Sequence, residues 1–247
     1  MENKETKIRL DRLCASQLND ISRKDVKKLC AKGLVTVNGN VVKDSDFRVS
    51  AEDEIIVNGQ KINYRKHIYI MLNKPAGYVC STRDGKSPTV LELVPPEMMR
   101  KGLFPAGRLD KDTEGFVLLT DDGELAHNML SPKKHVCKEY FVRLEKPWEN
   151  SYKQAFEKGM EIDGGEKCLP AEFVGNVENK LECNVILREG KFHQIKRMFA
   201  SLGNKVVFLR RISIGNLPLD PNLPLGSCLE IVHKDVEKML TNRRSDC

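Results

Sequence analysis

The stretch from Gly107 to Gly123, GRLDKDTEGFVLLTDDG, places five carboxylates around an apolar run. Two kinds of chemistry use such a cluster. The spacing D-x-D-x-E-G, which begins at Asp110, resembles the first half of an EF-hand calcium loop. Alternatively, one carboxylate serves as a nucleophile or general base, and the other acids shape the turn that holds it.

The segments on either side of the acids favour the second interpretation. An EF-hand loop needs a helix at each end. The residues before Asp110 read GLFPAGRL, whose proline and glycines oppose a helix, and the residues after Gly115 read FVLLT, which is typical of a buried strand. We therefore expect no metal site. Asp110 stands apart because it lies between Arg108 and Lys111 at a turn before this strand. The other four acids are expected to be solvated, with one of the last two capping the next helix: Asp112, Glu114, Asp121 and Asp122.

Other catalytic and cofactor motifs are absent from the sequence. It contains no H-E-x-x-H, no G-x-S-x-G, no phosphate-cradling glycine loop and no G-x-G-x-x-G. The eight cysteines include no C-x-x-C pair, and the five histidines have no ligand spacing. His127 and His193 are expected on helices, in structural or surface roles. The sequence thus contains no recognisable motif for a cofactor, and no cofactor is expected.

Composition and charge describe a well-solvated protein with a sizeable core. Apolar residues make up 40% of the chain and charged residues 31%, and the net charge of +6 is compatible with an anionic partner. Cys14, Cys30 and Cys183 lie in apolar patterns, as small buried hydrophobes do. The N-terminus has no apolar signal core, and no apolar run approaches the length that spans a membrane. We expect a cytoplasmic protein with reduced cysteines and no membrane partner.

The first 58 residues suggest a small domain with a basic helix. Apolar residues of 8–18 follow a helical stripe, and a second helix is expected over 22–32, with Ser22 as N-cap, Asp25 as its partner and Gly33 after its end. Asn38-Gly39 then predicts a hairpin turn, and a short strand follows at 53–57. Five basic residues of the second helix face away from its apolar side and suit a phosphate backbone: Arg23, Lys24, Lys27, Lys28 and Lys32.

The remainder of the chain alternates irregularly between strand and helix patterns. Strands are expected at 68–72, 116–120, 138–145, 181–189 and 205–215, and helices at 124–132, 151–158 and 192–203. The first strand is expected to break at Asn73, and Pro132 to stop the first of these helices. In the last helix we expect an inward stripe of Phe192, Ile195, Phe199 and Leu202. Without regular β-α-β spacing, the pattern favours an α+β domain with a mixed, mostly antiparallel sheet.

Two segments resemble known families. The span from Arg9-Leu10-Asp11 to VTVNG is similar to the S4 RNA-binding module. AGRLDKDTEG resembles the G-R-L-D motif of the RsuA-type pseudouridine synthases. Further segments agree in the family's order: MLNKPAGYVCST, SPTV, LLTDDGELAH, KEYFVRLE, EGKFHQIKRMFASLGNKVV and RRISIGNLPLD. The resemblance implies an S4-like domain at 1–58, a linker at 59–67, a pseudouridine synthase domain at 68–238 and a polar tail at 239–247.

The resemblance also implies roles for particular residues. Asp110 matches the family's catalytic aspartate, and Tyr140 the tyrosine that packs on the target base. The cation that keeps the aspartate ionised comes from HQIKR, where Lys196 or Arg197 is the candidate. Arg108, next to the aspartate, would help to extrude the target nucleotide.

The function implied is an isomerase that converts a uridine of ribosomal RNA to pseudouridine. The segments FHQIKR, YVCST and SPTV look like those of the small-subunit (16S) enzymes. Alternatives are a large-subunit (23S) synthase and a non-catalytic rRNA-binding assembly factor. We expect a monomer. Because the basic helix has no obvious base-reading side chains and must rely on RNA shape, we also expect the protein to meet its RNA in a partly assembled small subunit.

Overall fold

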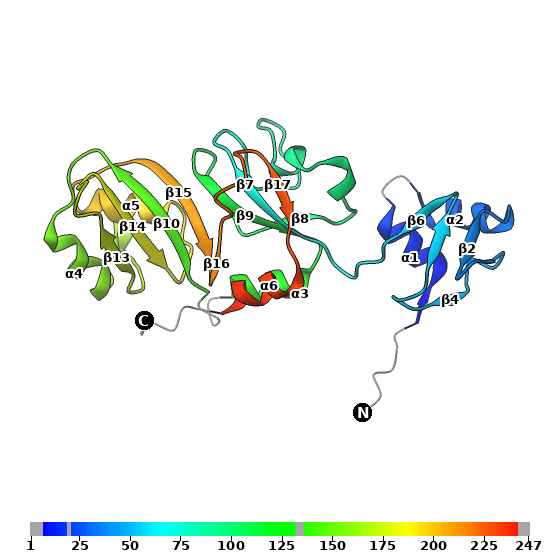
Figure 1. Cartoon of the computed structure of the whole chain (residues 1–247). Coiled ribbons are helices and arrows are strands. Elements are labelled where there is room, and N and C mark those ends of the chain that lie inside the picture. Colours follow the sequence, from blue (N-terminus) through cyan, green and yellow to red (C-terminus); the bar gives the residue numbers. More distant parts are fainter. Residues whose placement is uncertain (1–6, 19–20, 132–135, 242–247) are drawn as a thin grey trace, which may run out of the picture. The chain divides into compact units, whose positions relative to one another are not determined.

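The computed structural model describes residues 7–18, 21–131 and 136–241, which form two compact units (Figure 1). The first unit comprises Met1–Ile68 together with Pro96–Gly102, and the second comprises Tyr69–Pro95 and Leu103–Cys247. The chain therefore passes from one unit to the other three times. None of the helices in the described residues combines the length and hydrophobicity needed to cross a membrane.

The first unit packs two helices against short strands. Its elements are, in chain order, β1 (Ile8–Arg9), α1 (Leu10–Gln17), α2 (Arg23–Ala31), β2 (Val35–Val37), β3 (Asn40–Val41), β4 (Arg48–Val49), β5 (Ile55–Val57) and β6 (Gln60–Ile62). An antiparallel sheet has the order β3-β2-β5-β6, and β1 pairs separately with β4. Residues from both helices and from β2, β4, β5 and β6 share one apolar core.

Local sequence signals explain the boundaries in this unit. Ser22 caps α2 in a reciprocal capping box with Asp25, and Gly33 follows the helix with a φ of 73°. Asn38 and Gly39 both have positive φ, as the two-residue hairpin turn requires. These expectations are confirmed. The expected helical stripe is wrong at its start, because Ile8–Arg9 pairs with β4 as a strand. The expected linker 59–67 contains β6, which pairs with β5.

The second unit is built on one large sheet. Its strands are, in chain order, β7 (Tyr69–Lys74), β8 (Phe104–Ala106), β9 (Glu114–Thr120), β10 (Lys138–Leu144), β11 (Glu161–Ile162), β12 (Glu166–Lys167), β13 (Glu172–Gly175), β14 (Glu182–Leu187), β15 (Val206–Ile214), β16 (Leu217–Pro218) and β17 (Cys228–Glu230). Its α-helices are α3 (Gly123–Leu130), α4 (Asn150–Lys158), α5 (Gln194–Ser201) and α6 (His233–Leu240). Asp122 caps α3 by accepting a hydrogen bond from the Leu125 amide, as the sequence predicts for this position.

The sheet has the order β13-β14-β10-β15-β9-β7-β17, and β11 pairs with β12 outside it. Its pairings are antiparallel except between β15 and β9, so the fold is α+β with a mixed, mostly antiparallel sheet, as expected. Only two residue pairs, Arg210 with Glu114 and Arg211 with Gly115, join β15 to β9. A Cβ on Gly115 would lie 2.2 Å from the Arg211 carbonyl oxygen. Only glycine fits this seam.

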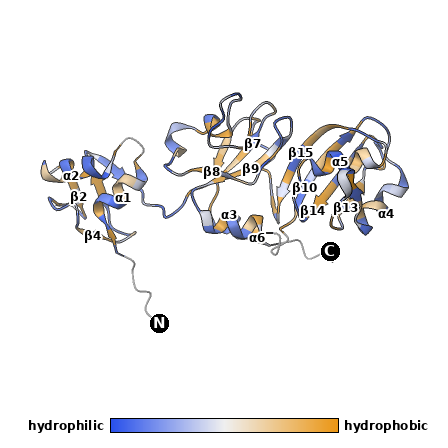
Figure 2. Ribbon diagram, turned by 180° about the vertical axis from the view of Figure 1, so that it is seen from behind, coloured by the Kyte–Doolittle hydropathy of each residue, from blue (hydrophilic) through white to orange (hydrophobic). Residues whose placement is uncertain are grey.

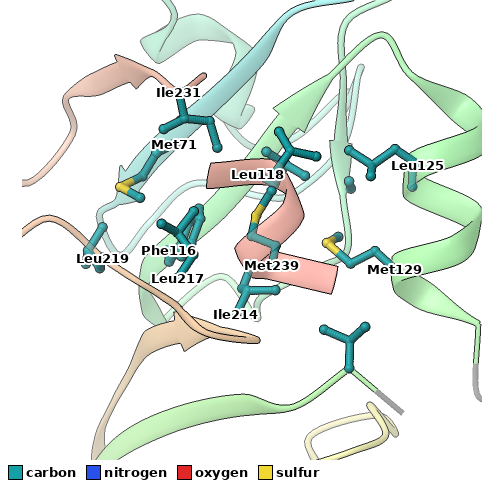
Figure 3. Packing of buried hydrophobic residues seen from close by; sticks show 14 residues of the cluster. Met71, Phe116, Leu118, Leu125, Met129, Ile214, Leu217, Leu219, Ile231 and Met239 are labelled. Carbon is teal, nitrogen blue, oxygen red and sulfur yellow. The ribbon is translucent and has the colours of Figure 1, made fainter. Parts of the chain in front are cut away.

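Apolar residues cover both halves of the sheet. In Figure 3, Met71 of β7 and Phe116 and Leu118 of β9 pack with Met129 of α3 and Met239 of α6. The strands β7 and β9 are almost entirely buried and include some of the most hydrophobic stretches in Figure 2. In the other half, ring contacts join α4, β13 and α5 through Tyr152, Phe156, Phe173 and Phe199.

Several expectations are wrong at the ends of elements. β7 does not break at Asn73 but continues through Lys74, and both side chains are buried. α5 begins at Gln194, which leaves Phe192 outside the helix and 73% exposed. The expected polar tail from residue 239 overlaps α6, in which Met239 is fully buried. Residues 242–247 and Pro132 lie outside the described residues.

Candidate active site

Asp110 lies on the loop that joins β8 to β9. The strand β8 precedes Asp110 and the strand β9 begins at Glu114, which does not fit the helix–loop–helix geometry of an EF-hand. The Thr113 amide donates to the Asp110 carbonyl oxygen at 3.1 Å and closes a turn. Lys74, whose side chain is buried, donates from Nζ to the carbonyl oxygens of Asp110, Lys111 and Thr113 at 3.1, 3.3 and 2.7 Å. One buried ammonium thus fixes the backbone of this loop, and burial lowers the pKa of Lys74.

The carboxylate of Asp110 is partly shielded and has a close cation. Its side chain is 25% exposed, and Oδ2 lies 3.3 Å from Nζ of Lys196. The same ammonium donates to Oδ1 of Asp112 at 2.6 Å, so Lys196 bridges two acids of the loop. Partial burial has the largest single effect on the pKa of Asp112 and would raise it, but the hydrogen bond and the charge of Lys196, with smaller contributions from other groups, together lower the pKa. The expectation that Asp112 is simply solvated is therefore incomplete.

Arg197 points to a different group of acids. Its guanidinium pairs with Asp163 and with Glu166, the latter at 2.8 Å. Hydrogen bonds from Arg197 and Lys191 lower the pKa of Glu166. Of the two cations that the sequence offers as partners of Asp110, the structure brings Lys196 to the carboxylate and directs Arg197 elsewhere.

A pocket of about 830 Å³ opens beside Asp110. Its lining includes three residues that the sequence singles out and one that the sheet brings beside them: Arg108, Asp110, Tyr140 and Arg211. Tyr140 is buried on β10, as the alternation of that strand predicts. Arg108 is exposed at the pocket and forms no ion pair with Asp112 or Glu114 in the described part of the chain. An aromatic residue and a carboxylate therefore line the same pocket.

Sequence reasoning missed two cations that line this pocket. Arg211 lies directly opposite Tyr140 on the neighbouring strand, so both side chains leave the same face of the sheet. Its Nε donates to the Phe116 carbonyl oxygen at 2.7 Å, and its buried Nη2 has no hydrogen-bond partner among the described residues. Lys138, two residues before Tyr140, lies on that face as well; burial and the neighbouring Arg211 lower its pKa to about 8.

His193 is the other site residue whose role the sequence did not indicate. It is not within a helix but precedes α5 in a left-handed conformation, with φ 48° and ψ 32°. Its Nε2 lies 3.6 Å from Oδ1 of Asp110. The contact depends on a backbone conformation that helical periodicity cannot predict.

The basic side of α2 is as the sequence predicts. Val26 and Cys30 are buried, whereas the five basic residues are all exposed. Arg23 pairs with Asp11 at 2.9 Å and Lys28 with Asp25 at 3.4 Å. The remaining three form no ion pair with any described carboxylate: Lys24, Lys27 and Lys32. Free cations on one helix side leave charge available for an anionic partner.

Comparison with known proteins gives a consistent assignment. The family model for RNA pseudouridylate synthase matches residues 68–201, and the S4 domain model matches residues 8–55. An uncharacterized RNA pseudouridine synthase of Bacillus subtilis is 43% identical over 93% of this chain and 97% of its own length. Proteins named ribosomal small subunit pseudouridine synthase A are similar too. The one from Pasteurella multocida is 42% identical over 89% of this chain and 94% of its own, and the one from Escherichia coli is 38% identical over 94% and 100%.

A solved structure agrees with these matches. The crystal structure of a pseudouridylate synthase superposes with a TM-score of 0.65 at 38% sequence identity, and covers 94% of this chain and 99% of the other. Sequence, fold and domain order therefore agree along almost the whole chain. The chain belongs to the RNA pseudouridylate synthase family and is an isomerase with an S4 domain in front of its synthase domain.

Proposed function

We propose that this protein converts a uridine of small-subunit (16S) ribosomal RNA to pseudouridine, and that it meets this RNA in a partly assembled small subunit. Relatives named for the ribosomal small subunit, which match nearly the whole chain, support the choice of RNA. The observation that carries the proposed site is the 3.3 Å contact between Asp110 and Lys196 in the wall of a pocket that also contains Tyr140.

The reaction needs only groups that the pocket offers. The N1–C1′ bond of uridine breaks, the uracil turns, a C5–C1′ bond forms, and the proton of C5 is exchanged for one on N1. Asp110 acts in this sequence as nucleophile or as general base, and it must be ionised in either role. Nζ of Lys196 lies 3.3 Å from Oδ2 of Asp110.

Tyr140 and Arg108 would bring the base to Asp110. A base inside folded RNA is out of reach until it leaves its stack, and an exposed cation beside the pocket can hold the extruded nucleotide by its phosphate. Arg108 has this position. Tyr140 would pack on the face of the flipped uracil, since aromatic stacking on an unpaired base is worth about 1–3 kcal/mol.

Arg211 and Lys138 would place positive charge beneath the base. When the N1–C1′ bond breaks, uracil keeps the electron pair, and the negative charge spreads over N1 and the two carbonyl oxygens. A guanidinium is a donor only; Arg211 lines the pocket, and its buried Nη2 has no hydrogen-bond partner among the described residues. Fixed donors aimed at developing charge lower a barrier most effectively in a site that excludes water.

The basic side of α2 would hold the RNA by its phosphates, with selectivity from the folded RNA shape. One chain carries Asp110, Lys196 and Tyr140 together, so we propose that a monomer is sufficient. We also propose that the protein acts in the cytoplasm, where small subunits assemble.

The test uses RNA labelled with tritium at uracil carbon 5, because isomerisation releases that tritium to water. The protein is incubated with 16S and 23S rRNA, each free and in partly assembled particles, and the product is mapped. We expect release from 16S rRNA, greatest in the particles. Modification confined to 23S rRNA would show that the proposed target is wrong, and no release from any RNA would overturn the proposed activity.

A further inference from the structure

Phe192 is an aromatic side chain held in solvent at the edge of the pocket. Its side chain lines the same pocket as Asp110, yet the residue is 73% exposed. A phenyl ring gains about 1.5–3 kcal/mol when it is fully buried, so leaving one in water forgoes that stabilisation. Single exposed apolar residues are common on protein surfaces. Exposure alone therefore does not mark Phe192 as a binding residue.

The backbone of His193 is left-handed directly after Phe192. A non-glycine residue in the left-handed region costs on the order of 1 kcal/mol. A regular helix through residue 193 would bring Phe192 onto the buried side with Ile195 and Phe199, where the hydrophobic pattern points. The left-handed turn prevents this and begins α5 at Gln194. The chain thus accepts local strain at the position that keeps Phe192 exposed.

The two rings form a flat double layer. Their centroids are 3.8 Å apart with an interplanar angle of 19°, and the His193 ring in turn reaches the Asp110 carboxylate at 3.6 Å. Stacking on His193 restricts the orientation of Phe192 and fixes it relative to Asp110. His193 covers one face of the Phe192 ring, whereas the exposure of Phe192 leaves apolar surface for another planar group.

An unpaired RNA base is a planar group that fits this exposed apolar surface. An RNA that delivers one uridine to Asp110 must lead its flanking nucleotides past the pocket edge. Extruding the target also removes a stacking partner from each neighbouring base. Exposed aromatic rings are the usual platforms for such unpaired bases, and they accept any base because every base has a π face. Arg108, which is exposed, also lines the pocket, and a cation there suits a phosphate backbone.

We propose that Phe192, backed by His193, is the stacking platform for the base of a nucleotide directly adjacent to the target uridine. The inference rests on the proposed function, because it assigns a subsite next to the reacting base. It adds a second base-binding position to the pocket, outside the one assigned to Tyr140. The platform selects for an unpaired base at that neighbour, without preference for its identity.

The test is a double-mutant cycle between protein and RNA. Wild-type protein and Phe192→Ala are each assayed by tritium release on intact small-subunit RNA particles and on particles with an abasic ribose immediately 5′ or 3′ of the target. On intact RNA, Phe192→Ala should lower kcat/KM by about 5- to 150-fold, which corresponds to the ~1–3 kcal/mol of one stacked base. With the abasic site on the correct side, the two proteins should become equal.

Further variants separate stacking from simple hydrophobic contact. Phe192→Trp should keep wild-type kcat/KM, and Phe192→Leu should lose most of it, because leucine lacks a flat ring. Val177→Ala is the matched control, since Val177 is 81% exposed but does not line the pocket, and it should change nothing. Equal losses for Phe192→Ala on intact RNA and on both abasic RNAs would overturn the inference, as would full activity of Phe192→Leu.

Equilibrium binding tests the stacking platform even if the proposed function is wrong. If wild-type protein releases no tritium from any RNA, the same cycle is measured as equilibrium binding of the small-subunit particles. A binding loss for Phe192→Ala that disappears with one abasic neighbour still supports the platform. A loss that persists with both abasic RNAs, or no loss at all, excludes it.

Discussion

Lys196 and Arg197 are consecutive residues of α5, yet their side chains reach different acids. Lys196 contacts Asp110 and Asp112 on the loop before β9, whereas Arg197 is bound by Asp163 and Glu166. The 100° step between neighbours on a helix produces this divergence. The two cations therefore cannot replace each other, and their removal should have different consequences.

Replacing Lys196 with methionine should lower kcat by about 100- to 1,000-fold, which is typical when a preorganised charge partner is removed. The variant leaves Asp110 without its ammonium while keeping the side-chain length. Lys196→Arg should restore part of the rate. Single-turnover tritium release measures the chemical step directly.

Arg197→Gln is the matched comparison. It removes contacts to Asp163 and Glu166, so we expect a lower midpoint of thermal unfolding with a single-turnover rate close to wild type. A loss of rate as large as that of Lys196→Met would show that the assignment of Lys196 as the partner of Asp110 is wrong.

Asp110→Asn should abolish isomerisation and leave RNA affinity nearly unchanged. The amide keeps the size of the carboxylate but can serve neither as nucleophile nor as base. Lys196 retains its hydrogen bond to Asp112, so the loop should keep its shape. Turnover and filter binding are compared on the same RNA. More than about 1% residual turnover, a barrier change of only ~2.7 kcal/mol, would be incompatible with the proposed role of Asp110.

Positive charge on Lys138 should be visible in the pH dependence of the rate. Its pKa is lowered to about 8, so the side chain is charged below pH 8 and neutral above it. If the charge stabilises the detached uracil, kcat falls as pH rises through about 8. Lys138→Met should lower kcat below pH 8 and remove this decline. An identical alkaline decline in wild type and variant would exclude Lys138 as its source.

The basic side of α2 predicts the salt dependence of RNA binding. Replacing Lys24, Lys27 and Lys32 with glutamine should reduce the slope of log affinity against log salt by about 2–3, since each phosphate contact contributes ~0.7–0.9. Point substitutions are preferable to removing residues 1–58, because that cut would leave β6 without β5. The control replaces Lys153, Lys158 and Lys167, which are exposed on the other unit. Equal slopes for both triple variants would mean that α2 is only a solvated helix.

Features that depend on neighbours in sequence were predictable. The capping box of Ser22 and Asp25 and the cap at Asp122 follow from side chains within one turn. The burial of Tyr140 follows from the two-residue period of a strand. In each case the physical cause acts over at most a few residues, and the sequence alone contains it.

Features that depend on strand order or on unusual backbone conformations were not predictable. Nothing local indicates that Arg211 stands beside Tyr140, because the sheet pairing decides it. The choice between Lys196 and Arg197 required the position of the loop before β9. The inward position expected for Phe192 is wrong. Helical periodicity predicts it only if the helix includes His193, but the backbone of His193 is left-handed and α5 begins at the next residue.

The division of the chain has a consequence for protein engineering. Residues Pro96–Gly102 cluster with the N-terminal unit although they follow β7 of the other. A chimera that exchanged only residues 1–68 between relatives would combine one protein's N-terminal unit with another protein's segment 96–102. Contacts such as the 3.0 Å hydrogen bond from Nη2 of Arg100 to the Arg65 carbonyl oxygen would then join segments of different origin. A chimera should therefore exchange residues 1–68 and 96–102 together.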